Sequence, residues 1–237
     1  NAGNSIASGG NYNVCVGDEA GTAISTGDNN VVVGYQAGDA LDAGGNNVAI
    51  GFRALSAEDG HGTNIAIGSD TLKVQNAGAN AYNIAIGHDA GKAVSTGVKN
   101  TLIGGSAGDS LTTNGLNVAV GYGALSTEDT GSRNVAIGVS ALSSQNADTT
   151  NYNVAVGYNS GAAITTGINN TLIGGLAGDS LTDADYNTAV GFGALGADVL
   201  GSRSVAIGFD ALTTQNPATA VNMYNVGVGF NAGQQIT

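Results

Sequence analysis

Large and small apolar residues alternate over short stretches of this chain, in a five-residue unit that recurs along its length. The unit reads asparagine, β-branched residue, small residue, isoleucine or valine, and glycine, as in residues 47–51 and 134–138. A β-branched run this short, bracketed by Asn and Gly, predicts one short strand between turns. The thirteen units open at Asn13, Asn30, Asn47, Asn64, Asn83, Asn100, Asn117, Asn134, Asn153, Asn170, Asn187, Ser204 and Asn225.

The spacing of these units predicts the fold class. Successive units lie 17 residues apart, except that every fourth interval is lengthened to 19 or 21 residues. Super-repeats therefore cover 13–82, 83–152, 153–224 and, incompletely, 225–237, after a leading segment 1–12. A period of 17 is too short for paired helices, so we expect an all-β parallel solenoid with one coil per repeat and a single repeat domain over 13–237. The alternative, an antiparallel meander, would need two-residue turn signals between the strands.

Asparagine at position 1 and glycine at position 5 of each coil predict a turn ladder. Asparagine tolerates a left-handed conformation and can hydrogen-bond its equivalent in the next coil. Glycine is expected where φ is positive or where neighbouring coils leave no room for a Cβ atom. Position 5 is occupied by Gly17, Gly34, Gly51, Gly68, Gly87, Gly104, Gly121, Gly138, Gly157, Gly174, Gly191, Gly208 and Gly229.

Two further positions vary in a complementary way. A coil with Gly at position 9 has a large aliphatic residue at position 12, whereas a coil with Leu at position 9 is polar at position 12. Because protein interiors are close-packed, this exchange is what a shared interior of constant width requires. Position 9 reads Gly21, Gly38, Leu55, Leu72, Gly91, Gly108, Leu125, Leu142, Gly161, Gly178, Leu195, Leu212 and Gly233, and position 12 reads Ile24, Leu41, Glu58, Gln75, Val94, Leu111, Glu128, Gln145, Ile164, Leu181, Asp198, Gln215 and Ile236.

The alternation of side chains along a strand divides the unit into two faces. We expect the large residues at positions 2 and 4, such as Val48 and Ile50, to fill the interior and position 3 to point away from it. Position 3 is nevertheless apolar, and a strand that is apolar on both faces is usually buried on both. We therefore predict an oligomer face at this row, with a merely tolerated alanine row as the alternative. The predicted face comprises Ala49, Ala66, Ala85, Leu102, Ala119, Ala136, Ala155, Leu172, Ala189 and Ala206.

The Asn-Val-Ala-Ile-Gly motif at residues 47–51 and 134–138 resembles the head repeats of YadA-like trimeric autotransporter adhesins. It is also similar to related repeats of bacteriophage tail fibres. The resemblance extends from Asn13 to Gly229, although the repeats of this chain are longer than is usual in the family. It implies a left-handed parallel β-roll, three chains side by side and a role in surface attachment, and it carries no catalytic residues over to this chain.

Composition and charge exclude several partners. The chain has 40 glycines, one proline and a formal net charge of −12, so a nucleic-acid backbone or an anionic membrane would repel it. No apolar run is long enough to insert into a membrane, and the start at Asn1 shows no signal-peptide pattern, as in a mature product or a piece of a longer polypeptide. Cys15 is the only cysteine and is expected to be a small buried hydrophobe. The terminal repeats lack an evident cap, so we expect more protein, or another subunit, to continue the solenoid at one or both ends.

Residues with catalytic or metal-binding chemistry are few. His61 and His88 do not recur at equivalent positions, which predicts solvated loop histidines and neither metal nor cofactor. The acidic pairs that start at Glu58 and Glu128 are interpreted as loop charges, because sequence neighbours point apart and the third copy reads Asp198-Val199. The alternative is a glycan-cleaving pair.

Recognition is expected in the variable turns, because loops on a rigid scaffold can change without disturbing the interior. The lengthened turns 75–82, 145–152 and 215–224 are the predicted binding loops, and they end at Tyr82, Tyr152 and Tyr224. These tyrosines either face a ligand or pack on the flank of the solenoid. Arg133 and Arg203 lie one super-repeat apart and are predicted to form surface ion pairs, with glycan contact as the alternative.

These features together predict a non-enzymatic, fibrous attachment module, extracellular, on a cell surface or a virion. It would form a homotrimer and display its loops to a host-surface glycan or protein. An ice-binding solenoid is the alternative from another class, although threonine at 26, 96 and 166 recurs only every fourth coil.

Overall fold

The computed structural model describes residues 1–6 and 9–236, and this part of the chain contains strands and turns but no helix. The chain forms two compact units, Asn1–Asn117 and Val118–Thr237. Within the described residues, no helix is long and apolar enough to cross a bilayer. The first unit contains β1 (Val14–Val16), β2 (Val31–Val33), β3 (Val48–Ile50), β4 (Ile65–Ile67), β5 (Ile84–Ile86) and β6 (Thr101–Ile103). The second contains β7 (Val118–Val120), β8 (Val135–Ile137), β9 (Val154–Val156), β10 (Thr171–Ile173), β11 (Thr188–Val190), β12 (Gly201–Ser202), β13 (Val205–Ile207), β14 (Val221–Asn222) and β15 (Val226–Val228).

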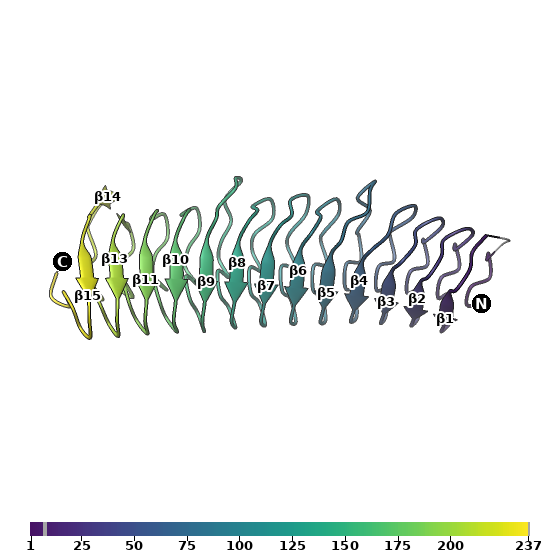
Figure 1. Cartoon of the computed structure of the whole chain (residues 1–237), viewed down its shortest axis with the longest axis horizontal. Helices are drawn as coiled ribbons and strands as arrows, with labels where there is room; N and C mark the ends of the chain where they lie inside the picture. The colour runs from purple at the N-terminus through teal and green to yellow at the C-terminus, as the bar shows by residue number, and fades with distance from the viewer. Residues whose placement is uncertain (7–8, 237) are drawn as a thin grey trace. The chain divides into compact units, whose positions relative to one another are not determined.

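Each five-residue unit forms one strand, and the strands pair in parallel. In the first unit β1 to β6 pair in sequence order, with each residue opposite its equivalent in the next repeat, such as Val48 opposite Ile65 (Figure 1). In the second unit β7, β8, β9, β10, β11, β13 and β15 pair in the same way, and β12 pairs with β14 in a separate two-stranded sheet. The prediction of a parallel β-solenoid with one coil per repeat is confirmed.

The opening asparagines form the predicted ladder. The Oδ1 atom of Asn30 accepts the backbone N–H of Asn47 at 2.9 Å, and its Nδ2 atom donates to the carbonyl of Gly44 at 2.8 Å. Equivalent bonds run within each unit, so each buried amide joins its own coil to the next. The left-handed conformation expected at position 1 falls instead on the preceding residue, as at Tyr82 (φ 53°) and Leu116 (φ 66°).

Both reasons expected for glycine at position 5 hold. The φ angles of these thirteen glycines lie between 123° and 143°. A Cβ atom on Gly174 would lie only 2.5 Å from the carbonyl oxygen of Gly191, so coil contact also excludes a side chain.

The two faces of the strands are the reverse of the prediction. Position 3 lies inside the coil, where Ala49, Ala136 and Leu172 have no exposed surface, so this row cannot be an oligomer face. The same correction holds for every residue of the predicted face: Ala49, Ala66, Ala85, Leu102, Ala119, Ala136, Ala155, Leu172, Ala189 and Ala206 are all 0% exposed. Positions 2 and 4 point outward and are partly exposed, as shown by Ile137 at 39% and Ile173 at 41%. The interior of the coil is narrow, and the position-3 row that faces it consists mainly of small residues.

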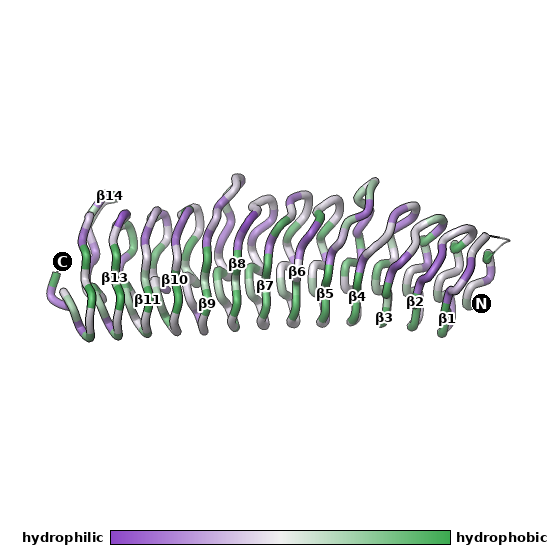
Figure 2. Tube along the Cα trace, viewed as in Figure 1, coloured by the Kyte–Doolittle hydropathy of each residue, from purple (hydrophilic) through white to green (hydrophobic). Residues whose placement is uncertain are grey.

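The exchange between positions 9 and 12 is confirmed. Leu55 and Ile24, which fill the two alternative positions, are both 0% exposed. A Cβ atom on Gly38 would lie 2.7 Å from Cδ1 of Leu41, so the aliphatic side chain occupies the space that glycine leaves. In Figure 2 the strands carry much of the hydrophobic colour, and most of the hydrophilic colour lies in the turns.

The polar residues at position 12 are also inside, which corrects the interpretation of Glu58 and Glu128 as loop charges, whereas Asp59 is exposed as expected. Glu58, Glu128, Asp198 and the three glutamines Gln75, Gln145 and Gln215 are all 0% exposed. Each glutamine accepts a hydrogen bond from the opening asparagine of the next coil, as Gln145 Oε1 does from Asn153 Nδ2 at 2.6 Å. Each of these side chains has at least one hydrogen bond, but Glu58 Oε2 and Gln75 Nε2 have no partner among the described residues.

Candidate functional site

The outward side of the strands presents a continuous apolar surface within each unit. In the second unit, positions 2 and 4 carry only valine, isoleucine and two threonines, and their isoleucines are 39–41% exposed: Ile137, Ile173 and Ile207. We call the outward rows at positions 2 and 4, together with the aromatic residues at position 6, the apolar strip. A contiguous exposed apolar surface of this kind is typical of a protein contact.

Position 6 adds an aromatic row to the apolar strip, which the sequence analysis missed. In the second unit Phe192, Phe209 and Phe230 are stacked with ring centroids 5.6 and 5.3 Å apart. In the first unit Tyr35 stacks on Phe52 at 5.7 Å. The signal was present in the sequence, because these aromatic residues directly follow the position-5 glycines.

The predicted binding loops lie in the upper turns in Figure 1, and the turns after β4 and β8 rise above their neighbours. The tyrosines at their ends are half exposed: Tyr82 at 54%, Tyr152 at 53% and Tyr224 at 68%. About half of the surface of each tyrosine, or slightly more, is thus open to solvent, and the rest is covered.

The two predicted surface arginines stack on tyrosines instead of forming ion pairs. The Arg133 guanidinium lies 5.6 Å from the ring centroid of Tyr152, and that of Arg203 lies 4.6 Å from Tyr186. Arg203 Nε also donates to Asn222 Oδ1 at 3.0 Å. Among the described residues neither arginine has a carboxylate within ion-pair distance, so the ion-pair prediction is wrong. These stacked pairs leave planar cationic and aromatic groups at the turn surface.

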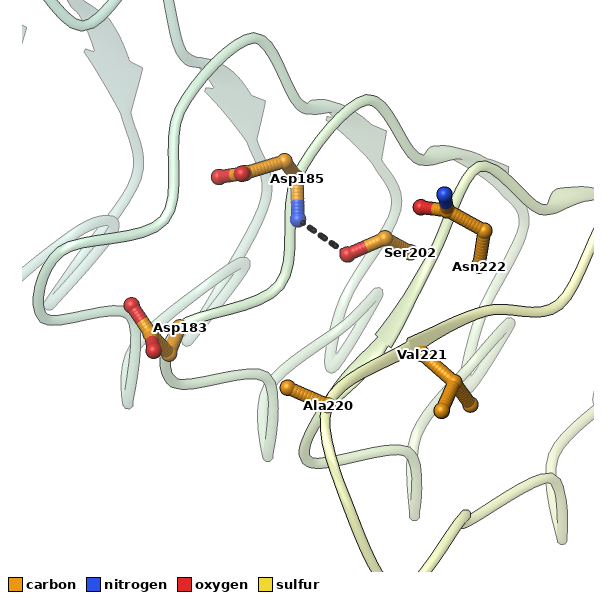
Figure 3. A pocket seen from close by; sticks show the side chains of 6 residues that line it. All are labelled: Asp183, Asp185, Ser202, Ala220, Val221 and Asn222. Carbon is orange, nitrogen blue, oxygen red and sulfur yellow. Dashed lines mark hydrogen bonds between the residues drawn. The ribbon is translucent and has the colours of Figure 1, made fainter.

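A shallow polar hollow of about 420 Å³ lies beside the second pair, between three successive turns of the second unit. Asp183 and Asp185 come from one turn, Ser202 from the next, and Ala220, Val221 and Asn222 from the lengthened turn (Figure 3). The backbone N–H of Asp185 donates to Ser202 Oγ at 2.9 Å, and the carboxylate of Asp185 accepts the N–H of Ile168 at 2.8 Å. The hollow is therefore rich in hydrogen-bond acceptors that already have partners in the protein.

The interior carboxylates at position 12 share one local arrangement. Glu128 Oε1 accepts the N–H of Gly131 at 2.6 Å and Asp198 Oδ1 accepts that of Gly201 at 2.7 Å. Burial is the largest influence on these groups and raises the pKa of both carboxyls, and the donated hydrogen bonds oppose it. Because Glu128 is fully buried, it does not face a cleft in which a substrate could lie.

The first of these carboxylates has a histidine beside it. Glu58, Asp59 and His61 place one ligand-type atom each within 4.8 Å of one another. The His61 side chain is 35% exposed and thus half-buried, contrary to the expected solvated loop residue, whereas His88 is 71% exposed as expected. Cys15, in the first coil, is partly buried.

No protein-family model, curated protein or solved structure matches this chain. The resemblance to adhesin and tail-fibre repeats thus stays a prediction from the repeat motif.

Proposed function

We propose that this chain is a non-enzymatic, structural and attachment module of an extracellular fibre, on a cell surface or a virion, and that it works as a homotrimer. The observation that carries the proposal is the apolar strip. Isoleucines at position 4 and aromatic residues at position 6 stay well exposed in the interior coils, from Ile103 at 36% to Tyr122 at 67%. Removing such a surface from water favours association by roughly 25 cal/mol for each Å² of apolar area.

The strip suits a second copy of the same chain better than a small ligand. It is regular, with one pair of β-branched residues for each coil, so two parallel copies can match over many coils. The net charge of −12 keeps the remaining surface hydrated and directs contact to the uncharged strip. The number of three chains follows from the resemblance to trimeric adhesin repeats.

The experiment that tests the proposal is a measurement of mass in solution by sedimentation equilibrium. We expect three times the chain mass of 23.0 kDa at micromolar concentration. Ile173→Glu places a charge in the strip and should give monomers, whereas Val74→Glu should not, because Val74 is equally exposed, at 42%, but lies at position 11 outside the strip. A monomeric wild type, or a trimer that tolerates Ile173→Glu, would refute the proposal.

The attachment role is assigned to the turns. We expect the lengthened turns with Tyr82, Tyr152 and Tyr224 to contact a host-surface glycan or protein, because these tyrosines are 53–68% exposed and aromatic side chains are enriched at such contacts. Glycan-array binding of the trimer is the measurement. Loss of binding in Tyr152→Ala, with binding retained in Leu116→Ala, supports this role, and the reverse pattern contradicts it; Leu116 is 46% exposed and lies in an ordinary turn outside the apolar strip.

A further inference from the structure

The first super-repeat contains a buried carboxylate whose hydrogen bonding is incomplete. Glu58 Oε1 accepts the backbone N–H of His61 at 3.2 Å, as Glu128 and Asp198 do with the residue three positions further on. Within the described part of the chain Glu58 Oε2 has no hydrogen-bond partner, although the side chain is 0% exposed. A buried carboxylate oxygen without a partner is energetically costly, so this atom requires a cation or a donor.

The equivalent residues of the second unit have the partner that Glu58 lacks. Glu128 Oε2 accepts Asn151 Nδ2 at 3.0 Å and the N–H of Ala147 at 3.4 Å. The residue equivalent to Asn151, 70 positions earlier, is Ala81, which has no side-chain donor. The carboxylate is thus the same in both places, but its amide partner is missing in the first super-repeat.

In place of this amide, the first super-repeat offers an imidazole and a second carboxylate. His61 Nδ1 lies 3.9 Å from Glu58 Oε1 and is itself a buried atom without a hydrogen-bond partner among the described residues. Asp59 is exposed and supplies a carboxylate oxygen within 4.8 Å of both groups. At the positions of His61, the second and third super-repeats have Gly131 and Gly201.

We propose that Glu58, Asp59 and His61 bind one divalent transition-metal ion of the Zn²⁺ type. Imidazole and carboxylate ligands together favour Zn²⁺ over Ca²⁺ or Mg²⁺, which take oxygen ligands. Metal–ligand bonds of about 2.1 Å in a tetrahedral site put ligand atoms about 3.4 Å apart, so side chains now within 4.8 Å need to close by up to about 1.4 Å. Asp59 and His61 lie in a turn at the surface, so their side chains can make this movement, and solvent supplies the fourth ligand.

The ion would tie an interior side chain to the turn that follows it. Glu58 is fixed in the interior by its position in the coil, whereas Asp59 and His61 belong to the turn. The rival arrangement uses Gln75 in the next coil. Its Nε2 atom also lacks a partner, and a rotation could bring it to Glu58 as Gln215 Nε2 is brought to Asp198. These two arrangements differ in whether the chain binds metal, which an experiment decides.

The test is a titration of the full, metal-stripped chain with Zn²⁺ by calorimetry, followed by Co²⁺, whose visible spectrum reports a nitrogen ligand. We expect one ion per chain and a raised thermal midpoint in its presence. His61→Ala and Glu58→Gln should each weaken binding by about tenfold or more. Ala81→Asn should weaken it too, because it supplies Glu58 with the amide that Asn151 supplies to Glu128, and it keeps all three proposed ligands.

Two controls keep the proposal falsifiable. His88→Ala removes the only other histidine and Glu128→Gln removes the equivalent carboxylate, and both should bind Zn²⁺ as the wild type does. Absence of stoichiometric binding by the folded wild type overturns the proposal and favours the Gln75 arrangement. Binding that survives both His61→Ala and Ala81→Asn, or that is equally strong for Ca²⁺, also overturns it.

Discussion

Leu172 and Ile173 are neighbours on β10 and point to opposite sides of the strand, so a pair of alanine substitutions tests which side is the interior. Leu172 is 0% exposed and lies between two glycines, because a Cβ atom on Gly161 or Gly178 would lie 2.8 or 2.9 Å from its methyl groups. Ile173 is 41% exposed on the apolar strip. Residue size alone does not separate these two side chains, so a difference between the variants reports the direction of each.

The structure sets the expected magnitudes apart. Buried leucine-to-alanine changes destabilise proteins by about 2–5 kcal/mol. We expect about 4 kcal/mol for Leu172→Ala, because the neighbouring glycines have no side chains that could fill the cavity. Ile173→Ala removes three carbon atoms worth about 0.8 kcal/mol each when buried, and with about 0.6 of the side chain covered the loss is about 1.4 kcal/mol.

The assay is urea unfolding followed by circular dichroism, at several protein concentrations. The loss in Leu172→Ala should not depend on concentration, whereas the loss in Ile173→Ala should grow with concentration if the apolar strip joins copies of the chain. Equal slopes against urea would show that all variants unfold to the same extent. If Ile173→Ala is the more destabilised variant at the lowest concentration, the assignment of the two strand faces is wrong.

Three further outcomes follow from the same structure. Gly174→Ala should destabilise the fold by more than about 3 kcal/mol, because a Cβ atom there would lie 2.5 Å from a carbonyl oxygen and φ is 137°. Gly175→Ala should change the stability by less than about 1 kcal/mol, since its Cβ atom would lie 3.4 Å from the Phe192 ring. Similar urea midpoints for the two variants would contradict this prediction. Asn170→Ala leaves the N–H of Asn187 and the carbonyl of Ala184 without these side-chain partners. We therefore expect a loss of about 2–4 kcal/mol in the free energy of unfolding and at least tenfold faster amide exchange at Asn187. Asn146 is exposed, so the control Asn146→Ala should show neither effect. The raised pKa of Glu128 means that the folded chain holds this proton more tightly than the unfolded chain. The contribution of Glu128 to the stability of the fold is therefore complete below about pH 4.3 and is lost as the pH rises through the folded pKa. Glu128→Gln should flatten this part of the profile of stability against pH, and an unchanged profile would show that Glu128 does not cause it.

Much of the fold could be predicted from the sequence because a solenoid repeats its constraints. Glycine at position 5 reports a φ angle that L-residues rarely adopt, and the asparagine at position 1 reports a hydrogen-bond ladder, so both follow from residue type and period. The hydrogen bonding of Glu58, Glu128 and Gln75 could not be predicted in this way. Polar residues at position 12 indicate a loop when they are considered alone, and only the three-dimensional position of the next coil shows that a backbone N–H or an asparagine amide reaches them.

The direction of the strand faces was predicted wrongly from size, although the sequence contains a better criterion. Alternation separates position 3 from positions 2 and 4 but does not say which side is inside, since both sides are apolar. The inward row is the one whose size is constrained by other interior positions. Position 3 meets this condition, because each of its residues larger than alanine lies in a coil with glycine at position 9, and every coil with leucine at position 9 has alanine at position 3. The larger residues are Cys15, Val32, Leu102 and Leu172, paired with Gly21, Gly38, Gly108 and Gly178.

Positions 2 and 4 show no such dependence on position 9, as expected of side chains that face outward. Leu102 makes the physical reason explicit. A Cβ atom on Gly91 or Gly108 would lie 2.7 or 2.8 Å from its methyl groups, so this leucine occupies the space that two glycines leave in adjacent coils. Compensation in volume between positions of one coil, not the size of the residues, therefore identifies the interior of a narrow solenoid. It assigns the large β-branched rows to the outside, where the proposed trimer contact needs them.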